Sequence, residues 1–414
     1  MKTSSPQSDR DYLYLGPTTS LKWLEHPFAY KKDTDELYEL GEEAFALLAL
    51  CDGTRSVAEL EPDEEWLAYC LEEGLLELSP TPHPLDRERL TSLQAAMALV
   101  GDLEAAGAHE RGEALPSLRY LTVDITNRCN LACRHCYLGP ARPLDLDPGL
   151  FGRLASEFEE AGGLRLIVSG GEPLLAPSFW EINEIVASPF YRSILSSNAT
   201  TIDDSVARRL RFDNVQVSLD GMRAGHDAVR GRGSFERVRR GMEALAGAGV
   251  GLSVATMVHS RNLGEFDAMA ELISAYPISA WTIDVPVAAG RMRASADLAP
   301  PLPEAAARLS YQFGSEVHES SGEWACGAHL GAVLADGTFA KCGFYSNWSS
   351  GRATEGLWAA WRSLPRLALS DLDCDCDRLD DCRGGCRFRA ELMAGDRRAP
   401  DPVGCAAHGL PVCG

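Results

Sequence analysis

The feature that most constrains this chain is a group of three closely spaced cysteines that directly follows an apolar run. The run spans residues 120–125, and the cysteines are Cys129, Cys133 and Cys136, spaced Cys-x3-Cys-x2-Cys. Three thiolates on one short loop can hold three irons of a cubane cluster and leave the fourth iron without a protein ligand. A small molecule can bind at such an open iron and receive an electron there. The loop therefore predicts a redox-active iron–sulfur site.

The composition and charge of the chain exclude several other classes of protein. The 414 residues are enough for two or three domains, and 45% hydrophobic with 24% charged residues is typical of a globular protein. A net charge of −21 argues against a nucleic-acid groove, which needs clustered Lys and Arg. No segment approaches the roughly 18 uninterrupted apolar residues of a membrane helix, and residues 1–10 lack the apolar core of a signal peptide. We therefore expect a cytoplasmic protein with no nucleic-acid and no membrane partner.

The thirteen cysteines are grouped rather than spread along the chain. Two lie within residues 1–128, three form the triad, none lies within residues 137–325, and eight follow. A secreted disulfide scaffold is short and distributes its bridges through the fold. Tight groups in a long chain indicate metal sites in a reducing compartment.

The first 80 residues predict a small separate domain. Strand-like and helical patterns alternate with turn signals, at residues 12–15, 20–24, 28–32, 37–40, 42–50, 57–60, 64–72 and 75–78. Strands followed by three short helices and a returning strand resemble the winged-helix recognition element of many peptide-modifying enzymes. Such modules bind a leader peptide as an added strand. A domain with a packing role only is the alternative, and Cys51 and Cys70, on apolar helical faces, are expected to be buried thiols.

A proline-rich boundary at residues 79–84 and a helical connector separate this domain from a repeating pattern. Apolar strands are predicted at residues 120–125, 164–168, 193–196, 215–219, 252–258 and 281–285, with amphipathic helices between them at 148–161, 179–187, 204–210, 235–246 and 263–275. Six such units predict an α/β fold, a partial (β/α)6 TIM-type barrel with its chemistry at the C-terminal ends of the strands. The predicted segments are 1–85, 86–118, 119–310 and 311–414, the second being the connector and the last a cysteine-rich iron–sulfur domain.

With the triad placed after the first strand of these units, residues 119–293 resemble the radical S-adenosylmethionine superfamily. A zinc site is the alternative for clustered cysteines, but zinc sites usually use paired Cys-x2-Cys knuckles that supply four ligands. The resemblance implies a [4Fe-4S] cluster whose open iron binds the amino and carboxylate groups of S-adenosyl-L-methionine. One-electron reduction then yields methionine and a 5′-deoxyadenosyl radical.

The resemblance also implies which residues contact the cosubstrate. Consecutive glycines let backbone approach a ligand closely, and Gly170, Gly171 and Glu172 would accept from the methionyl ammonium. His135 fills an aromatic position of the triad loop, and the backbone of Tyr137 would face the adenine. The remaining contacts would come from Asn198, Ser218 and Arg230. Loop capping or a surface ion pair is the alternative for Asn198 and Arg230, and Gly290 with Arg291 matches the family without an assigned role.

The last hundred residues carry a second cysteine pattern. It resembles the SPASM extension, which holds two auxiliary [4Fe-4S] clusters, and the resemblance implies Cys326, Cys342 and Cys386 for the first and Cys374, Cys376, Cys382 and Cys405 for the second. Cys374 and Cys376 are one residue apart where the family has Cys-x2-Cys. Residues 319–323 lack a further cysteine that some relatives use, so the first cluster would have an open iron, unless His329 or Cys413 closes it.

Together these features predict a radical enzyme that modifies a ribosomally made peptide held by its leader. The product would be a thioether or carbon–carbon crosslink or an epimerised residue, and a flavodoxin- or ferredoxin-type protein would supply electrons. Maturation of a redox cofactor or a modified haem is one alternative, and a non-catalytic iron–sulfur electron carrier is another. Gly343 replaces the Asp that sulfatase-oxidising relatives use as a base. Asp220 and Asp284 are bases or structural carboxylates, and no base is assigned.

Overall fold

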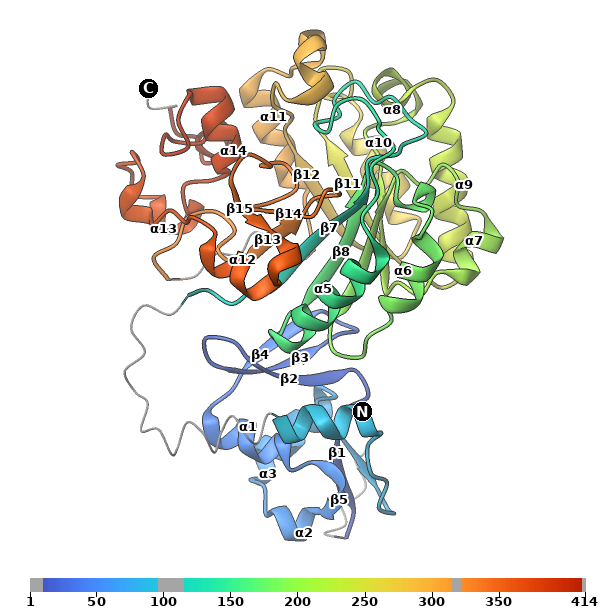
Figure 1. Ribbon diagram of the computed structural model, residues 1–414, viewed down its shortest axis with the longest axis vertical. Coiled ribbons are helices and arrows are strands. Elements are labelled where there is room, and N and C mark those ends of the chain that lie inside the picture. Colours follow the sequence, from blue (N-terminus) through green and yellow to red (C-terminus); the bar gives the residue numbers. More distant parts are fainter. Residues whose placement is uncertain (1–9, 96–114, 315–321, 412–414) are drawn as a thin grey trace. The chain divides into compact units, whose positions relative to one another are not determined.

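The structure is a computed structural model that describes residues 10–95, 115–314 and 322–411. The chain forms two compact units (Figure 1). The first comprises Met1–Ser117 with Pro189–Arg192, and the second comprises Leu118–Ser188 with Ser193–Gly414. No helix within the described residues is long and apolar enough to cross a membrane.

The first unit contains two small antiparallel sheets, with strand orders β5-β1-β6 and β2-β3-β4. Its elements are β1 (Tyr12–Leu15), β2 (Thr19–Trp23), β3 (Pro27–Lys31), β4 (Glu36–Glu39), α1 (Glu42–Ala49), β5 (Asp52–Ser56), α2 (Val57–Leu60), α3 (Glu64–Glu72) and β6 (Leu76–Ser79). Residues 87–95 are also helical, whereas the remainder of the predicted connector lies largely outside the described residues. Cys51 and Cys70 are buried thiols in the core of this unit, as expected.

The second unit is built on one nine-stranded sheet in the order β12-β11-β10-β9-β8-β7-β13-β14-β15. Its strands are β7 (Tyr120–Thr126), β8 (Arg165–Gly170), β9 (Arg192–Ser197), β10 (Asn214–Ser218), β11 (Gly251–Met257), β12 (Ile278–Asp284), β13 (Leu330–Val333), β14 (Thr338–Ala340) and β15 (Ser349–Arg352). The pairs β7–β8, β9–β10, β10–β11 and β11–β12 are parallel, and β8 lies beside β9. The α/β fold with a partial barrel is therefore confirmed.

Helices connect the parallel strands and pack on the sheet (Figure 1). They are α5 (Pro148–Glu160), α6 (Phe179–Ile185), α7 (Asp204–Arg209), α8 (Arg223–Arg230), α9 (Ser234–Gly247) and α10 (Phe266–Ser274). The Asp147 carboxylate accepts from the Leu150 amide, and Pro148 occupies the first turn of α5, so that helix starts with a side-chain cap. Asp203 caps α7 in the same way.

The two faces of the parallel sheet differ in character, because successive side chains of a strand point to opposite faces. One face is apolar and fully buried, with Val123, Val168 and Val217 as examples. The other is largely half-buried and mostly polar, and it carries Thr122, Ser169, Ser196, Gln216, Ser218 and Thr282. We call this second face the inner face of the sheet.

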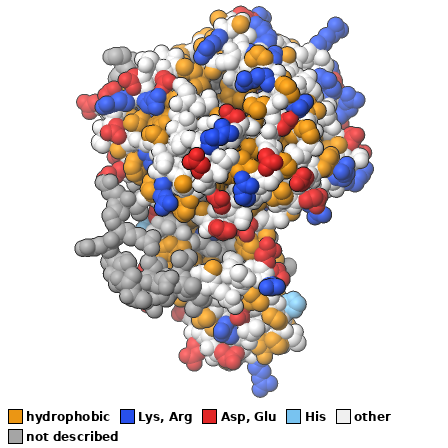
Figure 2. All heavy atoms as spheres, viewed as in Figure 1, with side chains coloured by type: hydrophobic (Ala, Val, Ile, Leu, Met, Phe, Trp, Pro, Cys, Tyr) orange, Lys and Arg blue, Asp and Glu red, His pale blue; other side chains and the backbone are white. Residues whose placement is uncertain are grey.

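The cysteine-rich segment continues this sheet instead of starting a new one. Strand β13 pairs in parallel with β7, with Val333 opposite Val123, and β14 and β15 follow in antiparallel order. The remaining helices are α11 (Leu302–Arg308), α12 (Leu357–Ser363), α13 (Leu379–Cys382), α14 (Arg387–Arg389) and α15 (Pro402–Ala407). Acidic and basic side chains are interspersed on the face of this unit that Figure 2 shows. The division of the chain into four segments stays a prediction.

Candidate active site

The three cysteines of the triad lie on the loop that leaves the C-terminal end of β7. Each of the three thiols lies close enough to the other two to interact electrostatically with them. Cys133 is buried, and this burial raises the pKa of its thiol to about 11. A buried thiol of this kind stays protonated unless a metal or a cation stabilises the thiolate.

The glycines that follow β8 pack directly under this loop. A Cβ atom on Gly170 would overlap the Thr126 carbonyl oxygen, and one on Gly171 would overlap that of Arg128. The backbone amides also bond there, Gly171 N to Thr126 O at 2.8 Å and Glu172 N to Arg128 O at 2.7 Å. The two glycines are therefore required by the triad loop itself, and their contact with a cosubstrate stays a prediction.

Glu172 links the triad loop to the end of β9. Its carboxylate is fully buried and accepts from the Ser197 hydroxyl and the Asn198 amide, both at 2.8 Å. The Asn198 side chain in turn donates to the Asn130 side chain, within the triad loop, at 2.9 Å. Burial raises the pKa of Glu172, and these hydrogen bonds oppose the rise. Asn198 thus braces the triad loop, and its contact with a cosubstrate stays a prediction.

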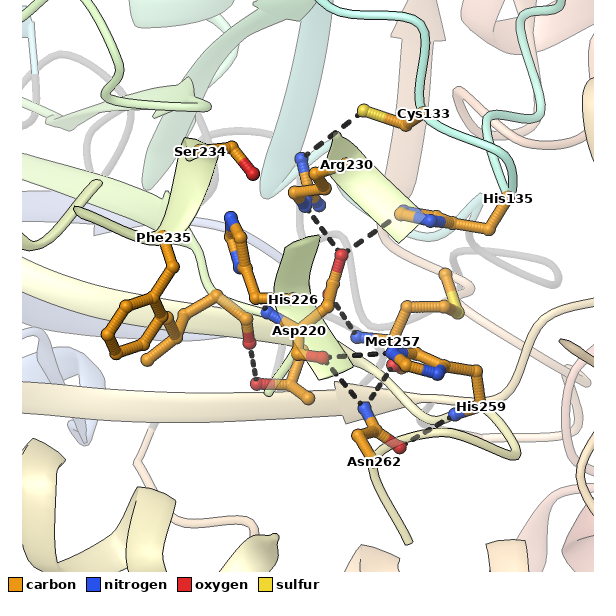
Figure 3. Close-up of polar contacts among 12 residues, drawn as sticks. Cys133, His135, Asp220, His226, Arg230, Ser234, Phe235, Met257, His259 and Asn262 are labelled. Carbon is orange, nitrogen blue, oxygen red and sulfur yellow. Dashed lines mark hydrogen bonds and ion pairs between the residues drawn. The ribbon is translucent and has the colours of Figure 1, made fainter. Parts of the chain in front are cut away.

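A buried carboxylate, Asp220, organises the opposite side of the loop (Figure 3). It follows β10, is 0% exposed, and bonds to Arg230 Nε at 2.5 Å and to His135 Nε2 at 3.3 Å. Arg230 Nη1 lies 4.0 Å from Cys133 Sγ. The Met257 amide donates to the other carboxylate oxygen at 2.8 Å. Arg230 is therefore a buried cation directed at the triad rather than a surface residue.

The protonation states of this group follow from its packing. Burial opposes ionisation of Asp220, but the Arg230 guanidinium beside it holds the pKa of Asp220 well below its usual range. The same pair raises the pKa of Arg230. Burial lowers the pKa of His135 to about 4, so His135 is neutral and its contact with Asp220 is a hydrogen bond. One fixed positive charge thus faces the thiol of Cys133.

Gly290 and Arg291, to which the sequence gave no role, hold the other end of the triad loop. The Arg291 amide donates to the Cys136 carbonyl at 2.9 Å, and its guanidinium donates to the Gly139 carbonyl at 3.1 Å. Gly290 has a φ of +49°, and a Cβ atom there would overlap the carbonyl oxygens of Cys136 and Tyr137. The sequence showed Gly290 and Arg291 as a motif, but not their contact with the triad loop, which lies about 150 residues earlier in the chain.

The side chain of Tyr137 connects the triad to the C-terminal cysteines. Its ring centroid lies 4.5 Å from that of Phe344, and a Cβ on Gly343 would lie 3.4 Å from its hydroxyl. Burial raises the pKa of the phenol well above its usual value, and Asp124, Cys136 and Cys342 add to the rise. Sequence reasoning expected only the backbone of Tyr137 to matter and did not single out Asp124. Ser218 ends β10 on the inner face, half-buried.

The first C-terminal set of cysteines is also brought together. Cys326 interacts electrostatically with Cys342 and hydrogen-bonds to Cys386. The ammonium group of Lys341 faces the first two of these thiols and donates to the Gly327 carbonyl at 2.6 Å. Burial lowers the pKa of Lys341 to about 8.

Two further residues bear on this first set. Asp284 lies close to Cys386 and forms an ion pair with Arg389. This pairing is typical of a structural carboxylate, which is one of the two roles that the sequence left open for Asp284. His329 is buried. Whether His329 closes the set stays a prediction, and Cys413 lies outside the described residues.

The second set groups the four cysteines that the resemblance implied. Cys405 interacts with Cys374, Cys376 and Cys382, and Cys374 interacts with the latter two. The one-residue spacing of Cys374 and Cys376 therefore does not keep Cys374 apart from the others.

The donor sets suit clusters better than single ions. Within the described residues, no three His, Cys, Asp or Glu side chains converge as the ligands of one metal ion do. Cubane clusters do not need such convergence, because each cysteine binds a different iron. Thiol-rich sets with a buried cation beside them therefore fit [4Fe-4S] clusters.

Comparison with known proteins assigns the class. A family model described as the radical SAM superfamily matches residues 123–273. Mycofactocin maturase MftC of Mycobacterium ulcerans is 30% identical over 335 residues, which cover 70% of this chain and 89% of that protein. The chain therefore belongs to the radical SAM superfamily and is a radical S-adenosylmethionine enzyme.

Other relatives match shorter stretches. MftC of Mycobacterium tuberculosis is 35% identical over 38% of this chain, and the chain spans 42% of its length. An AdoMet-dependent heme synthase of Oleidesulfovibrio alaskensis is 31% identical over 50% of this chain and 54% of its own. In fold, the chain is similar to Streptococcus suis SuiB bound to its precursor peptide SuiA, with a TM-score of 0.65, 13% identity, and coverage of 95% of this chain and 99% of that one.

Proposed function

We propose that this protein cleaves S-adenosylmethionine reductively and uses the resulting radical to modify a ribosomally made peptide. The observation that carries the proposal is the triad of Cys129, Cys133 and Cys136, whose thiols interact with one another beside the buried cation of Arg230. A cluster bound there would supply a 5′-deoxyadenosyl radical from its cosubstrate. The maturase relatives and the peptide-bound SuiB structure support a peptide as substrate.

The chain's own residues would hold and orient these groups. Asp220 fixes Arg230 and His135 against the triad, while Glu172 and Asn198 fix the loop from the other side. Cosubstrate contacts are proposed for the residues that surround the loop, His135, Tyr137, Gly170, Gly171, Glu172, Asn198, Ser218 and Arg230. A fixed cation near a thiolate-bound cluster also makes electron uptake by that cluster easier.

Two auxiliary [4Fe-4S] clusters are proposed for the C-terminal cysteines. Cys326, Cys342 and Cys386 would hold the first, and Tyr137 lies between these and the triad. The second would be held by Cys374, Cys376, Cys382 and Cys405. The proximity of the thiols within each set supports this division. We place the protein in the cytoplasm, with a flavodoxin- or ferredoxin-type reductant.

The first unit is proposed to hold the leader of the substrate. Strands β2 and β4 are the two edges of one of its three-stranded sheets. An extended peptide can pair with such an edge through main-chain hydrogen bonds. Calorimetry on the full-length protein should detect a peptide encoded by a neighbouring gene, and no heat with any such peptide contradicts this part of the proposal.

The test is anaerobic turnover with these peptides, followed by mass spectrometry. We expect 5′-deoxyadenosine and a peptide that has lost two hydrogens if a crosslink forms. An unchanged mass with deuterium uptake from solvent would indicate epimerisation. Cys133→Ala should abolish both products, whereas Cys70→Ala, at a buried cysteine in the first unit, should abolish neither.

The heme synthase relative favours a second candidate, maturation of a modified haem. Turnover with iron porphyrins and no modified peptide would select it. A non-catalytic electron carrier would form no 5′-deoxyadenosine at all.

A further inference from the structure

We propose that Asp124 is the proton acceptor of the reaction, the residue that takes the proton lost by the substrate when its new bond forms. This inference rests on the proposed function, and it supplies a base that the sequence could not assign. Asp124 lies on β7, the strand that leads into the triad loop.

The position of Asp124 is unusual for a carboxyl group. The residue is 1% exposed, and its Oδ1 has no hydrogen-bond partner among the residues that the structure describes. Its contact on the sheet is Ser169, the residue paired with it on β8, which donates a hydrogen bond to the carboxyl. A buried polar atom normally has a partner in the folded chain. An orphaned carboxyl oxygen therefore indicates a partner that binds from outside the chain.

The side chain belongs to the inner face of the sheet, where such a partner can approach. Thr122, two residues earlier on the same face, is half-buried, and so are Ser169 and Ser196 on the next two strands. The opposite face of the same strands is apolar and closed. The phenol of Tyr137 interacts electrostatically with both Asp124 and Cys136, so Asp124 lies close to a residue that also borders the triad. A substrate on the inner face beside Tyr137 would therefore be near both the carboxyl and the triad loop.

The other carboxylates of the site are already engaged. Asp220 pairs with Arg230, Asp284 pairs with Arg389, and Glu172 accepts from Ser197 and Asn198. No cation is paired with Asp124 among the described residues that affect its ionisation. Burial raises the pKa of Asp124 to about 7, close to the value at which a general base works best at neutral pH.

A crosslink removes two hydrogens from the substrate, one as a hydrogen atom and one as a proton with its electron. The substrate carbon first gives a hydrogen atom to the 5′-deoxyadenosyl radical, which becomes 5′-deoxyadenosine. The resulting carbon radical then bonds to a sulfur or carbon atom of the same substrate, and the S–H or C–H bond of that atom breaks. Its proton passes to the Asp124 carboxylate, and the remaining electron passes to a one-electron oxidant of the iron–sulfur class. The peptide has then lost two hydrogens.

The test compares Asp124→Asn with Asp204→Asn, the same chemical change at an exposed carboxylate of α7. Each variant is reconstituted, and its cluster content and 5′-deoxyadenosine yield are measured together with the crosslinked peptide. We expect Asp124→Asn to form 5′-deoxyadenosine normally but to lower the ratio of crosslink to 5′-deoxyadenosine by about 10²- to 10⁴-fold. Asp204→Asn should keep the wild-type ratio, and Asp124→Glu should restore part of it.

A wild-type ratio in Asp124→Asn overturns the inference, and so does loss of the clusters in both Asp124→Asn and Asp124→Glu, because the residue is then structural. A readout independent of turnover is the infrared carbonyl band of a protonated carboxyl. In the wild type this band should titrate near pH 7, and Asp124→Asn should lack it. Failure of the proposed function is distinguishable, because it appears in the wild type as the absence of any peptide product.

Discussion

Two buried carboxyl groups, Asp124 on β7 and Asp220 just after β10, have opposite ionisation behaviour. Asp220 is 0% exposed and Asp124 is 1% exposed, so burial opposes the charge of both. Asp220 nevertheless has a depressed pKa because Arg230 lies 2.5 Å away. The pKa of Asp124 is raised to about 7 because, among the residues that the structure describes, no cation offsets its burial. The neighbours of a buried acid, rather than its depth, decide whether it is charged.

This difference in pKa suits the two carboxyl groups to different roles around the triad loop. The Asp220 pair carries a permanent charge that holds Arg230 against Cys133, and a permanent charge is suited to positioning. Asp124 gains or loses a proton near neutral pH, which is suited to proton transfer. We therefore expect substitutions at Asp220 to affect the fold and the cluster, and substitutions at Asp124 to affect the fate of the substrate.

The largest effect is expected for Asp220→Ala. It leaves the Arg230 guanidinium buried without its counter-charge, and breaking a buried pair in this way costs about 3–5 kcal/mol. The free energy of unfolding, from denaturant titration of the anaerobic protein, should fall by that amount. The double variant Asp220→Ala with Arg230→Met should recover part of the loss. Equal stability of the single and double variants would show that the pair does not act as described.

The next effect concerns the dependence of stability on pH at Asp124. The pKa of Asp124 in the folded state is raised to about 7 from its ordinary value of 3.8. Between these values the folded state keeps a proton that the unfolded state has lost. Stability due to this group therefore falls as pH rises through this window, by about 4 kcal/mol in all. Denaturant titrations at pH 4.5 and 7.5 measure the free energy of unfolding of the wild type and of Asp124→Asn. The predicted effect is the change, between the two pH values, in the difference between these two free energies. An unchanged difference would mean that Asp124 ionises normally and is not the proton acceptor proposed above.

A third effect is expected at the glycine behind the triad loop. Gly290→Ala introduces a side chain at a positive φ and also an overlap with the Cys136 carbonyl. Gly249→Ala is a matched control, because Gly249 also has a positive φ but no atom lies within 4 Å of its added Cβ. Both share the cost of backbone strain, and Gly290→Ala should cost about 1–3 kcal/mol more through overpacking. Thermal unfolding of the two variants measures this difference in stability. The iron content should fall in Gly290→Ala and stay at the wild-type level in Gly249→Ala.

The sequence predicted the parts of this site that are local. The spacing of Cys129, Cys133 and Cys136 and the six strand–helix units could be recognised because each signal lies within a few residues. Strand β5 was missed, because Asp52–Ser56 is polar and contains a glycine that reads as a turn. Strands β13 to β15 were missed because they are short and rich in small residues. Strand β13, which joins them to the sheet, pairs with β7, which lies far earlier in the chain.

The contacts that decide the behaviour of the two carboxyl groups are equally distant in sequence. Nothing in the surroundings of Asp124 along the chain distinguishes it from an ordinary strand residue. Its partner Ser169 and its neighbour Tyr137 come from other elements, and the missing cation is a property of the packed site. The same holds for Asp220, whose contact with His135 joins two loops of different strands. Periodicity and motif spacing contain no information on such pairs.

The smallest effect is expected for an ion pair without burial, and it sharpens the contrast with Asp220. Arg211 and Glu184 lie 2.7 Å apart, with 56% and 60% of their side chains exposed. Water solvates both charges whether or not they pair, so Arg211→Gln should change the free energy of unfolding by only about 0–1 kcal/mol. Salt should reduce even this difference, because exposed charges are screened, whereas the effect of Asp220→Ala should persist. If Arg211→Gln lowered the free energy of unfolding nearly as much as Asp220→Ala does, burial would not be what makes an ion pair important for stability in this protein.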